Sequence, residues 1–240
     1  MSDTTSYTVD ADVFKGMSAL FRTADTIKIK ALPIGWSIIS VSPDHVSMTE
    51  FTVPRFKFEK YAEGSEFALS LKDVNAIAKL KGEKASVTID DGRAYVGTEK
   101  GVRIKVPLYA EEDSNIKIPK LQLDDSFPVA SEDLADYLNI ASGFGPVSMR
   151  FSTDMASNKV TVVSEGTVEG REASMTLDAE ITTSGYDAKS TFGFDYISDF
   201  VKAVGKGTMI IEMSTDYPIK MTADRGWVVS IIIAPRIEQE

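Results

Sequence analysis

The sequence contains no cysteine, only one histidine and no long apolar run. The absence of cysteine excludes a disulfide framework and a zinc site built from thiolates, and it fits a reducing intracellular compartment. A membrane-spanning helix needs roughly 20 apolar residues in succession, and no segment of the chain provides them. The opening residues, MSDTTSYTVD, have neither the basic nor the apolar segment of a secretory signal. We therefore expect a soluble intracellular protein with no membrane partner.

The protein is acidic. It has 26 lysines and arginines and 36 aspartates and glutamates, which gives a formal net charge of -10. Contacts with nucleic acid phosphates need lysine and arginine, so this balance argues against a nucleic acid partner. The argument fails if the cations are gathered on one surface, because a local basic patch can bind phosphate in an acidic protein. With 240 residues, 43% of them hydrophobic, the chain can form one large or two small globular domains.

Apolar residues at helical spacing predict a helix over Val9–Thr23, with Asp10 as its N-cap, and a second over Leu71–Leu80 that ends at Gly82. Short segments rich in β-branched residues predict the strands of the first half, with a turn at Asp90-Asp91-Gly92. These strands are Ile27–Lys30, Trp36–Val41, Val46–Val53, Glu66–Leu69, Ala85–Ile89, Ala94–Gly97 and Gly101–Tyr109.

An acidic segment without glycine, Glu111–Pro128, separates the two halves of the sequence. Its length and polarity predict an extended linker on the surface. Its few apolar anchors are Ile116, Ile118, Leu121 and Leu123.

The pattern of the first half restarts after this linker. Leu134, Leu138 and Ala141 correspond to Val13, Met17 and Leu20, and Phe194, Ile197 and Phe200 correspond to Leu71, Val74 and Ile77. This repetition indicates a duplicated α+β unit, with domains at residues 1–112 and 127–240 and a linker at 113–126. The last strand, Val228–Ile233, should leave its sheet at Ala234-Pro235, because proline cannot continue the hydrogen-bonded ladder.

Basic residues oppose the apolar face on three of the four predicted helices. They are Lys15, Arg22, Lys72, Lys79, Lys202 and Lys206. A charged helix face is often simply solvated, but its repetition on equivalent helices favours a phosphate-binding surface. No aromatic residue accompanies these cations, so such a surface would contact DNA without reading its sequence. The third helix differs, because its predicted exposed stripe is Glu132, Asp136 and Asn139.

Two motifs give the chain a family resemblance. The segment Val41–Val53 reads VSPDHVSMTEFTV, and the chain ends in IIIAPRIEQE. Together they resemble the DNA sliding clamps of archaea and eukaryotes, the proliferating cell nuclear antigen family, which carries a loop D-P-x-H-V-x-(L/M) and a C-terminal (L/Y)-A-P-(K/R)-I-E. The matching residues are Pro43, Asp44, His45, Val46 and Met48 in the loop and Ile233, Ala234, Pro235, Arg236, Ile237 and Glu238 in the tail.

The resemblance implies an α+β fold of two similar clamp domains, with antiparallel sheets outside and two helices each inside, that forms a closed ring of three subunits. The six cations would face DNA inside the ring. Subunits would join edge to edge, with the strand Val102–Leu108 of one subunit beside Ala173–Leu177 of the next. Such a ring is a processivity factor for DNA polymerase that has no catalytic residues, cofactor or metal.

The resemblance also implies a pocket for short partner peptides. Its residues would be Val41, His45, Val46, Met48, Ile116, Ile118, Leu121, Pro218, Ile232, Ile233, Ala234 and Pro235. The second half has Val163-Ser164 where the first has Val41-Ser42, but EGTVEG follows, so the pocket occurs once. Ser42 replaces the usual aspartate, and Ile232-Ile233 replaces the usual aromatic and leucine, which would alter partner preference.

The implied partners are double-stranded DNA, a clamp loader, and a DNA polymerase, flap nuclease and DNA ligase that dock through short peptide motifs. The implied location is the cytoplasm, at the nucleoid, or the nucleus of a eukaryote. Two alternatives stay open. One is a subunit of a heterotrimeric or checkpoint-type clamp, although the complete tail favours the replicative type. The other is an enzyme that binds metal through carboxylate clusters at Asp90-Asp91, Glu111–Asp113 or Asp124-Asp125, which is less compatible with their positions in turns and the linker.

Overall fold

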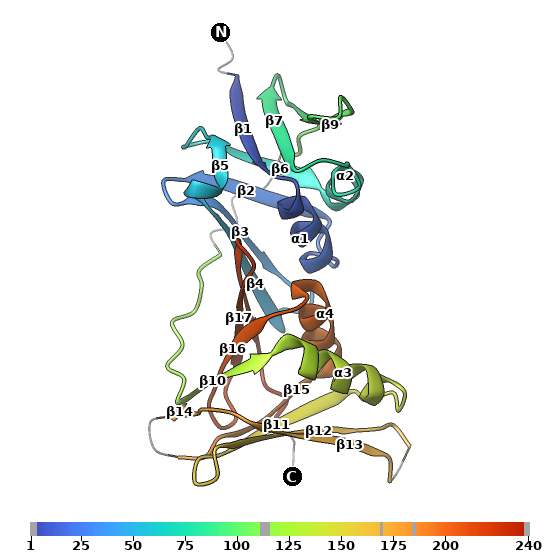
Figure 1. Cartoon of the computed structure of the whole chain (residues 1–240), viewed down its shortest axis with the longest axis vertical. Coiled ribbons are helices and arrows are strands. Elements are labelled where there is room, and N and C mark those ends of the chain that lie inside the picture. The colour runs from blue at the N-terminus through green and yellow to red at the C-terminus, as the bar shows by residue number, and fades with distance from the viewer. Residues whose placement is uncertain (1–3, 111–115, 169, 184–185, 238–240) are drawn as a thin grey trace. The chain divides into compact units, whose positions relative to one another are not determined.

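The computed structural model describes residues 4–110, 116–168, 170–183 and 186–237 (Figure 1). The start of the expected linker, the acidic cluster Glu111–Asp113 and the tail residue Glu238 lie outside these residues. The chain divides into two compact units. Unit 1 comprises Met1–Pro43, Thr49–Lys117 and Arg225–Val229, and unit 2 comprises Asp44–Met48, Ile118–Asp224 and Ser230–Glu240.

Unit 1 contains two sheets and two helices. Its elements are β1 (Thr5–Asp10), α1 (Asp12–Leu20), β2 (Thr26–Leu32), β3 (Gly35–Val41), β4 (Ser47–Pro54), the short 3-10 helix η1 (Arg55–Lys57), β5 (Phe58–Lys60), β6 (Glu66–Ser70), α2 (Leu71–Ile77), β7 (Lys84–Asp90), β8 (Arg93–Thr98) and β9 (Arg103–Pro107). One sheet has the order β5-β1-β7-β8-β9, and the other strands follow the order β4-β3-β2-β6.

Unit 2 repeats this arrangement. Its elements are β10 (Asp125–Ala130), α3 (Ser131–Ser142), β11 (Ser148–Asp154), β12 (Lys159–Glu165), β13 (Glu172–Asp178), β14 (Thr182–Thr183), β15 (Lys189–Gly193), α4 (Phe194–Val204), β16 (Thr208–Met213), β17 (Ile219–Asp224) and β18 (Val228–Ile233). The strand orders are β14-β10-β16-β17-β18 and β13-β12-β11-β15. Each matches its counterpart in unit 1 strand for strand, which confirms the predicted duplication of an α+β unit.

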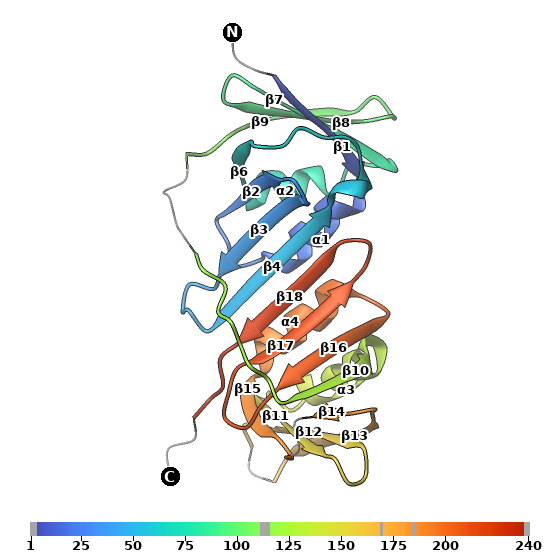
Figure 2. The same ribbon diagram turned by 90° about the vertical axis from the view of Figure 1, so that its left-hand side faces the viewer.

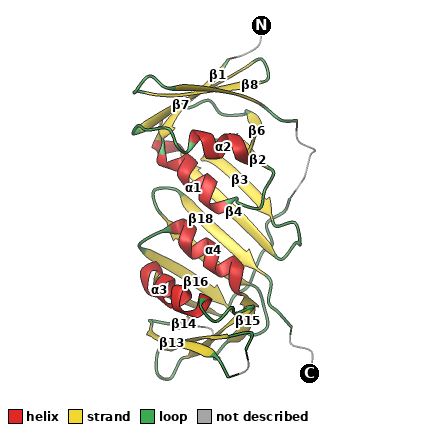
Figure 3. Ribbon diagram, turned by 90° about the vertical axis from the view of Figure 1, so that its right-hand side faces the viewer, coloured by secondary structure: helices red, strands yellow, loops and turns green. Residues whose placement is uncertain are grey.

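In each unit the two helices pack side by side and cover one face of the strands. Figure 3 shows α1 and α2 in front of β2 and β3, and α3 and α4 in front of the strands of unit 2. The opposite view in Figure 2 shows the strands in front of the helices. Val13 and Met17 of α1 and Ile197 and Val201 of α4 point into these layers and are almost fully buried. No helix in the described part of the chain is long and apolar enough to cross a membrane.

The core of unit 1 is built from aromatic side chains. Trp36 is fully buried and makes edge contacts with Tyr7, Phe14 and Phe58 at ring-centroid distances of 5.0–6.2 Å. Gly16 of α1 lies against the Trp227 ring, and a Cβ at this position would approach Trp227 to 2.9 Å. The helix can therefore pack this closely only because residue 16 is a glycine.

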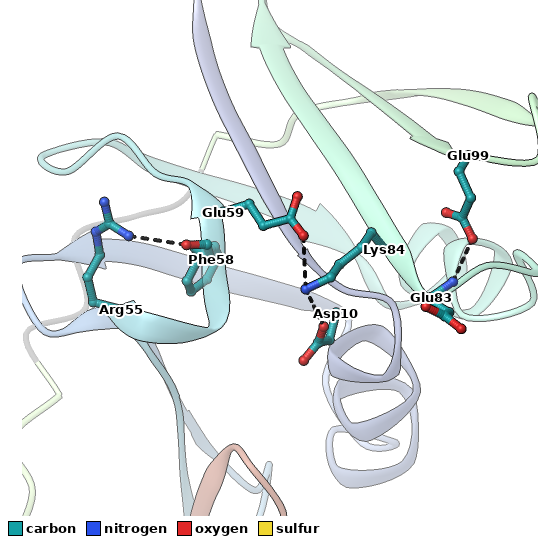
Figure 4. Close-up of polar contacts among 7 residues, drawn as sticks. All are labelled: Asp10, Arg55, Phe58, Glu59, Glu83, Lys84 and Glu99. Carbon is teal, nitrogen blue, oxygen red and sulfur yellow. Dashed lines mark hydrogen bonds and ion pairs between the residues drawn. The ribbon is translucent and has the colours of Figure 1, made fainter.

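The first predicted helix was too long at both ends. Val9 belongs to β1, where it and Tyr7 are buried on the same face, and α1 starts at Asp12. Asp10 is not an N-cap, because the N-cap is Ala11 and makes no side-chain cap. Asp10 instead lies 2.9 Å from Lys84 Nζ, which is also 3.3 Å from Glu59 (Figure 4). These two carboxylates raise the pKa of the Lys84 ammonium, with the hydrogen bond to Asp10 as the largest cause.

The second predicted helix also ends earlier, since α2 stops at Ile77 with Ala78 as its C-cap, ahead of Gly82. Ser70 is its N-cap and accepts a hydrogen bond from the Asp73 N–H at 3.1 Å. In the second half, β10 starts at Asp125, inside the segment predicted as linker. The strands β1, β5, β10, β11, β14, β15 and β17 were not predicted individually.

Candidate functional site

The loop between β3 and β4 carries the first of the two motifs. His45 is exposed and has a positive φ of 58°, a left-handed conformation that non-glycine residues rarely adopt. Asp44 stabilises the turn, because its Oδ1 accepts a hydrogen bond from the Val46 N–H at 3.3 Å. Its other carboxylate oxygen accepts a hydrogen bond from the hydroxyl of Tyr196 on α4. The imidazole of His45 is therefore presented to solvent by a loop that is fixed at the residue before it.

The tail after β18 lies against this loop. Ala234 N–H donates to the Val46 carbonyl at 2.9 Å, and two residues later Arg236 N–H donates to the Thr191 carbonyl at 2.7 Å. The side chains of Ala234 and Pro235 are half-buried. The structure thus joins the two motifs that the sequence separates by almost the whole chain.

The other expected pocket residues of unit 2 differ in the solvent exposure of their side chains. Val46, Met48, Leu121, Pro218 and Ile232 are half-buried, and Ile118 is 39% exposed. Pro218 lies in the turn between β16 and β17, and the linker is held near the start of that turn by the Asp124 N–H, which donates to Ser214 Oγ at 2.8 Å. Ile233 is fully buried, so it supports the tail from inside and, contrary to expectation, offers no exposed surface.

Two expected pocket residues belong to unit 1. Val41 and Ile116 line a cavity of about 600 Å³ together with Pro43, Ile39 and Lys28. Lys28 also forms an ion pair with Glu66 on β6. Ser42, which stands where the family carries an aspartate, is buried, so this substitution lies beneath the loop surface.

The six cations expected to face DNA are all exposed. Only Lys15, Lys72 and Lys202 lie on helices, because Arg22, Lys79 and Lys206 each come directly after the C-cap residue of α1, α2 or α4. Only one cation of each pair therefore lies on a helix, so the prediction that both oppose its apolar face was wrong for α1, α2 and α4. A cation just past a helix C-terminus is nevertheless well placed, since the helix dipole favours positive charge there.

The exposed acidic side chains on the helices are distributed unequally between the two units. On α1, Lys15 Nζ lies 2.7 Å from Asp12 Oδ1. On the helices of unit 2, the exposed acidic residues are Asp133, Asp136, Asp195 and Asp199, whereas the one cation is Lys202, with Lys206 just after α4. The expected basic surface is consequently concentrated in unit 1.

Glu132 was expected on the exposed stripe of the third helix, but it has a structural contact. Its Oε2 accepts a hydrogen bond from the Gly207 N–H at 2.9 Å. This hydrogen bond is the largest cause of the lowered pKa of the Glu132 carboxyl, with smaller contributions from Ser131 and the charge of Lys206. The exposed polar residues of α3 are Asp133, Asp136, Asn139 and Ser142.

Two of the three carboxylate clusters proposed for the enzyme alternative lie within the described residues. Asp90 is the last residue of β7, and Asp91 lies in the turn between β7 and β8. Asp125 is fully buried instead of solvated, and its Oδ2 accepts a hydrogen bond from Thr153 Oγ1 at 2.5 Å. Within the described ranges, no group of three or more His, Asp or Glu side chains could hold a metal ion.

Sequence reasoning missed Tyr196. Its hydroxyl contacts Asp44, which lies 152 positions away, and the chain around it shows only the apolar period of α4. No sequence signal at Tyr196 points to the loop.

Comparisons with known proteins agree with the motif resemblance over the whole chain. No family model matches the sequence. The chain is 24% identical to a DNA polymerase sliding clamp of Methanococcoides burtonii over 97% of its own length and 98% of that protein. Its fold matches A. fulgidus PCNA bound to the C-terminal region of FEN-1, with a TM-score of 0.86, 21% identity and complete coverage of both chains. It also matches a chain of the PCNA2-PCNA3 complex of Sulfolobus tokodaii, with a TM-score of 0.82, 18% identity and coverage of 97% of this chain and 100% of that one.

The similarity to curated clamps runs from end to end, the fold agrees, and the loop and tail motifs meet through the Val46–Ala234 hydrogen bond. Along its whole length and in its fold, the chain is therefore similar to the DNA polymerase sliding clamps of the proliferating cell nuclear antigen family.

Proposed function

We propose that this chain is a subunit of a closed three-subunit ring that encircles duplex DNA and tethers replication and repair enzymes to it. A ring retains DNA by topology, so the protein needs only weak, mobile phosphate contacts and a docking point for partners. Docking raises the effective concentration of an enzyme at the template. The ring has no catalytic task of its own, as is usual in this family.

The hydrogen bond between Ala234 and Val46 is the observation that carries this proposal, because it builds one surface from the two motifs. We assign the partner pocket to this surface, with His45 at its rim and the residues around Ile118, Leu121, Pro218 and Ile232 as its apolar wall. Val41 and Ile116, which line the cavity of unit 1, would also contact the partner. A polymerase, a flap nuclease and a ligase would each insert a short peptide here. For the flap nuclease, a related clamp has been solved with the C-terminal region of FEN-1.

We test the pocket with a labelled peptide of the clamp-binding type, which carries a glutamine and several hydrophobic residues. His45→Ala and truncation after Ile232 should each weaken its binding, because the first removes the exposed rim and the second removes the residue that pairs with Val46. We expect a loss of about tenfold or more for the truncation, as for a central interface element. Fluorescence anisotropy measures both, and unchanged affinity in the two variants would refute the pocket assignment.

Ring closure is proposed from the two sheet edges. In the described part of the chain, β9 is the last strand of one sheet and β13 is the last strand of another, and each presents an unpaired edge. Exposed cations, Arg103 and Lys105, lie on β9, whereas exposed anions, Glu172 and Asp178, lie on β13. Opposite charges on the two edges favour pairing of β9 with β13 of the next subunit.

Within each subunit we propose domains at 1–112 and 127–240 joined by the linker 113–126. The DNA-facing residues would be Lys15, Arg22, Lys72, Lys79, Lys202 and Lys206, and a clamp loader would open the ring. The protein would act at the chromosome, in the cytoplasm of a prokaryote or in the nucleus of a eukaryote.

A ring of non-identical subunits is the second candidate. It is favoured by the acidic helix surface of unit 2, where Asp133 and Asp136 are exposed and lysine or arginine is absent from α3. Such an acidic surface contributes little to phosphate binding, so the other subunits of the ring would have to supply the phosphate contacts. The related chain from Sulfolobus tokodaii was solved in a complex of two different clamp subunits.

A further inference from the structure

An exposed apolar patch lies in unit 1 where β2 turns into β3 and where β4 runs into η1. We call it the turn patch and define it as Pro33, Ile34 and Phe56 with the flanking cations Arg55 and Lys57. Phe56 is 80% exposed and Ile34 is 65% exposed, although both are large hydrophobic residues. Contiguous exposed hydrophobic residues rimmed by polar groups mark interaction surfaces.

The turn patch is held by specific hydrogen bonds and is not a loose loop. Arg55 N–H donates to the Ile34 carbonyl at 2.8 Å, and the Tyr61 hydroxyl donates to the Leu32 carbonyl at 2.6 Å. Gly35 has a φ of 131°, and a Cβ there would lie 2.0 Å from the Val53 carbonyl oxygen. The backbones of the two segments can approach this closely only with a glycine at this position.

Cations surround the apolar centre of the turn patch. Lys57 Nζ lies 5.8 Å from the centroid of the Phe56 ring, and the Arg55 guanidinium carbon lies 4.6 Å from the centroid of the Tyr61 ring. Both contacts hold positive charge beside aromatic surface. This local charge is opposite to the net charge of -10 of the whole protein.

We propose that the turn patch is a second docking surface, and that it binds a protein segment whose hydrophobic residues are flanked by aspartates or glutamates. The apolar residues would fit against Ile34 and Phe56, and the acidic residues would pair with Arg55 and Lys57. Bidentate pairing with a carboxylate is the geometry that the arginine fork favours.

A second copy of this chain fits the turn patch less well. In a two-fold contact the turn patches of the two copies would lie opposite each other. Arg55 and Lys57 of one copy would then face the same two cations of the other copy, and the like charges would repel. Nucleic acid also fits less well, because its binding needs several phosphate contacts. Pro33 and Ile34 cannot stack on bases, and Lys57 already lies over the Phe56 ring.

The turn patch is separate from the proposed peptide pocket. Ile34 precedes β3 and Pro43 follows it, and β3 has seven residues. At a rise of roughly 3.3 Å per residue, the two ends of the strand are roughly 20 Å apart. The proposal therefore does not depend on the pocket assignment.

The test uses the full chain in its native assembly with isotope-labelled isoleucine methyl groups. The probe is a fluorescent peptide with a Leu-Phe pair flanked by aspartates, and the control peptide has lysines in place of the aspartates. We expect saturable binding of the first peptide alone and a shift of the Ile34 methyl signal, with the exposed Ile140 methyl of unit 2 unchanged. Saturable binding of both peptides, or of neither, would overturn the proposal.

Three variants separate the contributions. Phe56→Ala should weaken binding about fivefold or more, as for a hydrophobic anchor, and Arg55→Glu with Lys57→Glu should weaken it by a similar factor and remove its salt dependence. Ile140→Ala, at a similarly exposed site, is the matched control and should bind normally. Because the Phe56 side chain is 80% exposed, Phe56→Ala should weaken binding without changing the melting temperature.

Two other outcomes would assign the turn patch to a different occupant and contradict the proposal. One is a shift of the Ile34 methyl on addition of duplex DNA that is abolished by Phe56→Ala. The other is concentration-dependent association of assembled rings that the same substitution abolishes. Both are read from the same samples, by methyl spectra and by light scattering.

Discussion

Among single residues, Tyr196 links α4 to the loop between β3 and β4. Its hydroxyl donates to Asp44, whose other carboxylate oxygen accepts from the Val46 N–H. Val46 in turn accepts from Ala234 through its carbonyl. The loop residue before His45 is therefore fixed on one side by α4, and the residue after it is fixed by the tail. His45 itself contributes exposed surface, and its left-handed backbone is stabilised by these neighbours.

We predict that Tyr196→Phe weakens peptide binding by about fivefold, because it removes one hydrogen bond to a charged acceptor, with a free energy of about 1 kcal/mol, and lets the loop move. The aromatic ring stays in place, so the melting temperature should change little. Anisotropy titration measures the affinity, and Tyr186→Phe, at an 81% exposed position of the same unit, is the control.

If the wild type binds the peptide and Tyr196→Phe binds it equally well, Tyr196 has no positioning role and the pocket assignment is unaffected. If the wild type does not bind at all, the pocket assignment itself fails. The two results are therefore distinguishable in one titration.

Among individual residues, the sequence allowed us to predict those that belong to continuous motifs. It did not reveal those whose role depends on a tertiary contact. The segments around His45 and Ala234 could be recognised because each is a run of neighbours in the chain. Tyr196 could not, since its contact depends on how α4 packs. Glu132 looked exposed from helical spacing, but the Gly207 N–H lies within hydrogen-bonding distance because the turn after α4 comes back to the start of α3.

Among the elements, the strands β9 and β13 are the most informative, because both are sheet edges that carry opposite charge. If they pair between subunits, reversing the charge of one edge should place like charges opposite each other. We predict that Arg103→Glu with Lys105→Glu converts the trimer into monomers, as read by native mass spectrometry of the purified chain.

The compensating change is the control for this prediction. Combined with Glu172→Lys and Asp178→Lys, the reversed β9 should meet a reversed β13, and trimers should return. Trimers that persist in the first variant would contradict the edge pairing. A wild-type chain that is monomeric alone, and that assembles only with a different clamp subunit, would favour the heteromeric ring.

The predicted elements were most accurate where apolar residues alternate strongly, and least accurate where an element is short. The strands around Trp36 and Val87 were located within two residues. β14 has two residues and β5 has three, which is too short for a period to be visible. The start of α1 was misplaced because the alternation of Tyr7 and Val9 in β1 runs directly into the helical period of Val13 and Met17.

For the whole molecule, the two units share one fold but not one charge pattern. The helices of unit 1 and the turns after them present Lys15, Arg22, Lys72 and Lys79. The helices of unit 2 present mainly aspartates, with Lys202 and Lys206 near the end of α4. Duplication preserved the apolar positions that build the core, whereas the exposed positions were free to diverge. The sequence therefore predicted the repeated fold well, but it predicted the distribution of basic residues between the two units poorly.

This asymmetry gives a test of DNA retention. We predict that Lys72→Ala with Lys79→Ala shortens the residence of the loaded ring on linear DNA with free ends more than Lys202→Ala with Lys206→Ala, because aspartates already offset the second pair of cations. Both should increase mobility along the DNA, since each removes phosphate contacts. Single-molecule fluorescence measures both quantities.

Topology supplies the control for this experiment. A ring that holds DNA by encirclement should stay on closed circular DNA in all variants and leave when the circle is cut, because the charge contacts alone are too weak to retain it at physiological salt. Release of the wild type from intact circles at the same rate as from cut ones would show that binding is adhesive. In that case the acidic surface of unit 2 would be a hindrance to DNA binding, and retention would have to depend on the cations of unit 1 alone.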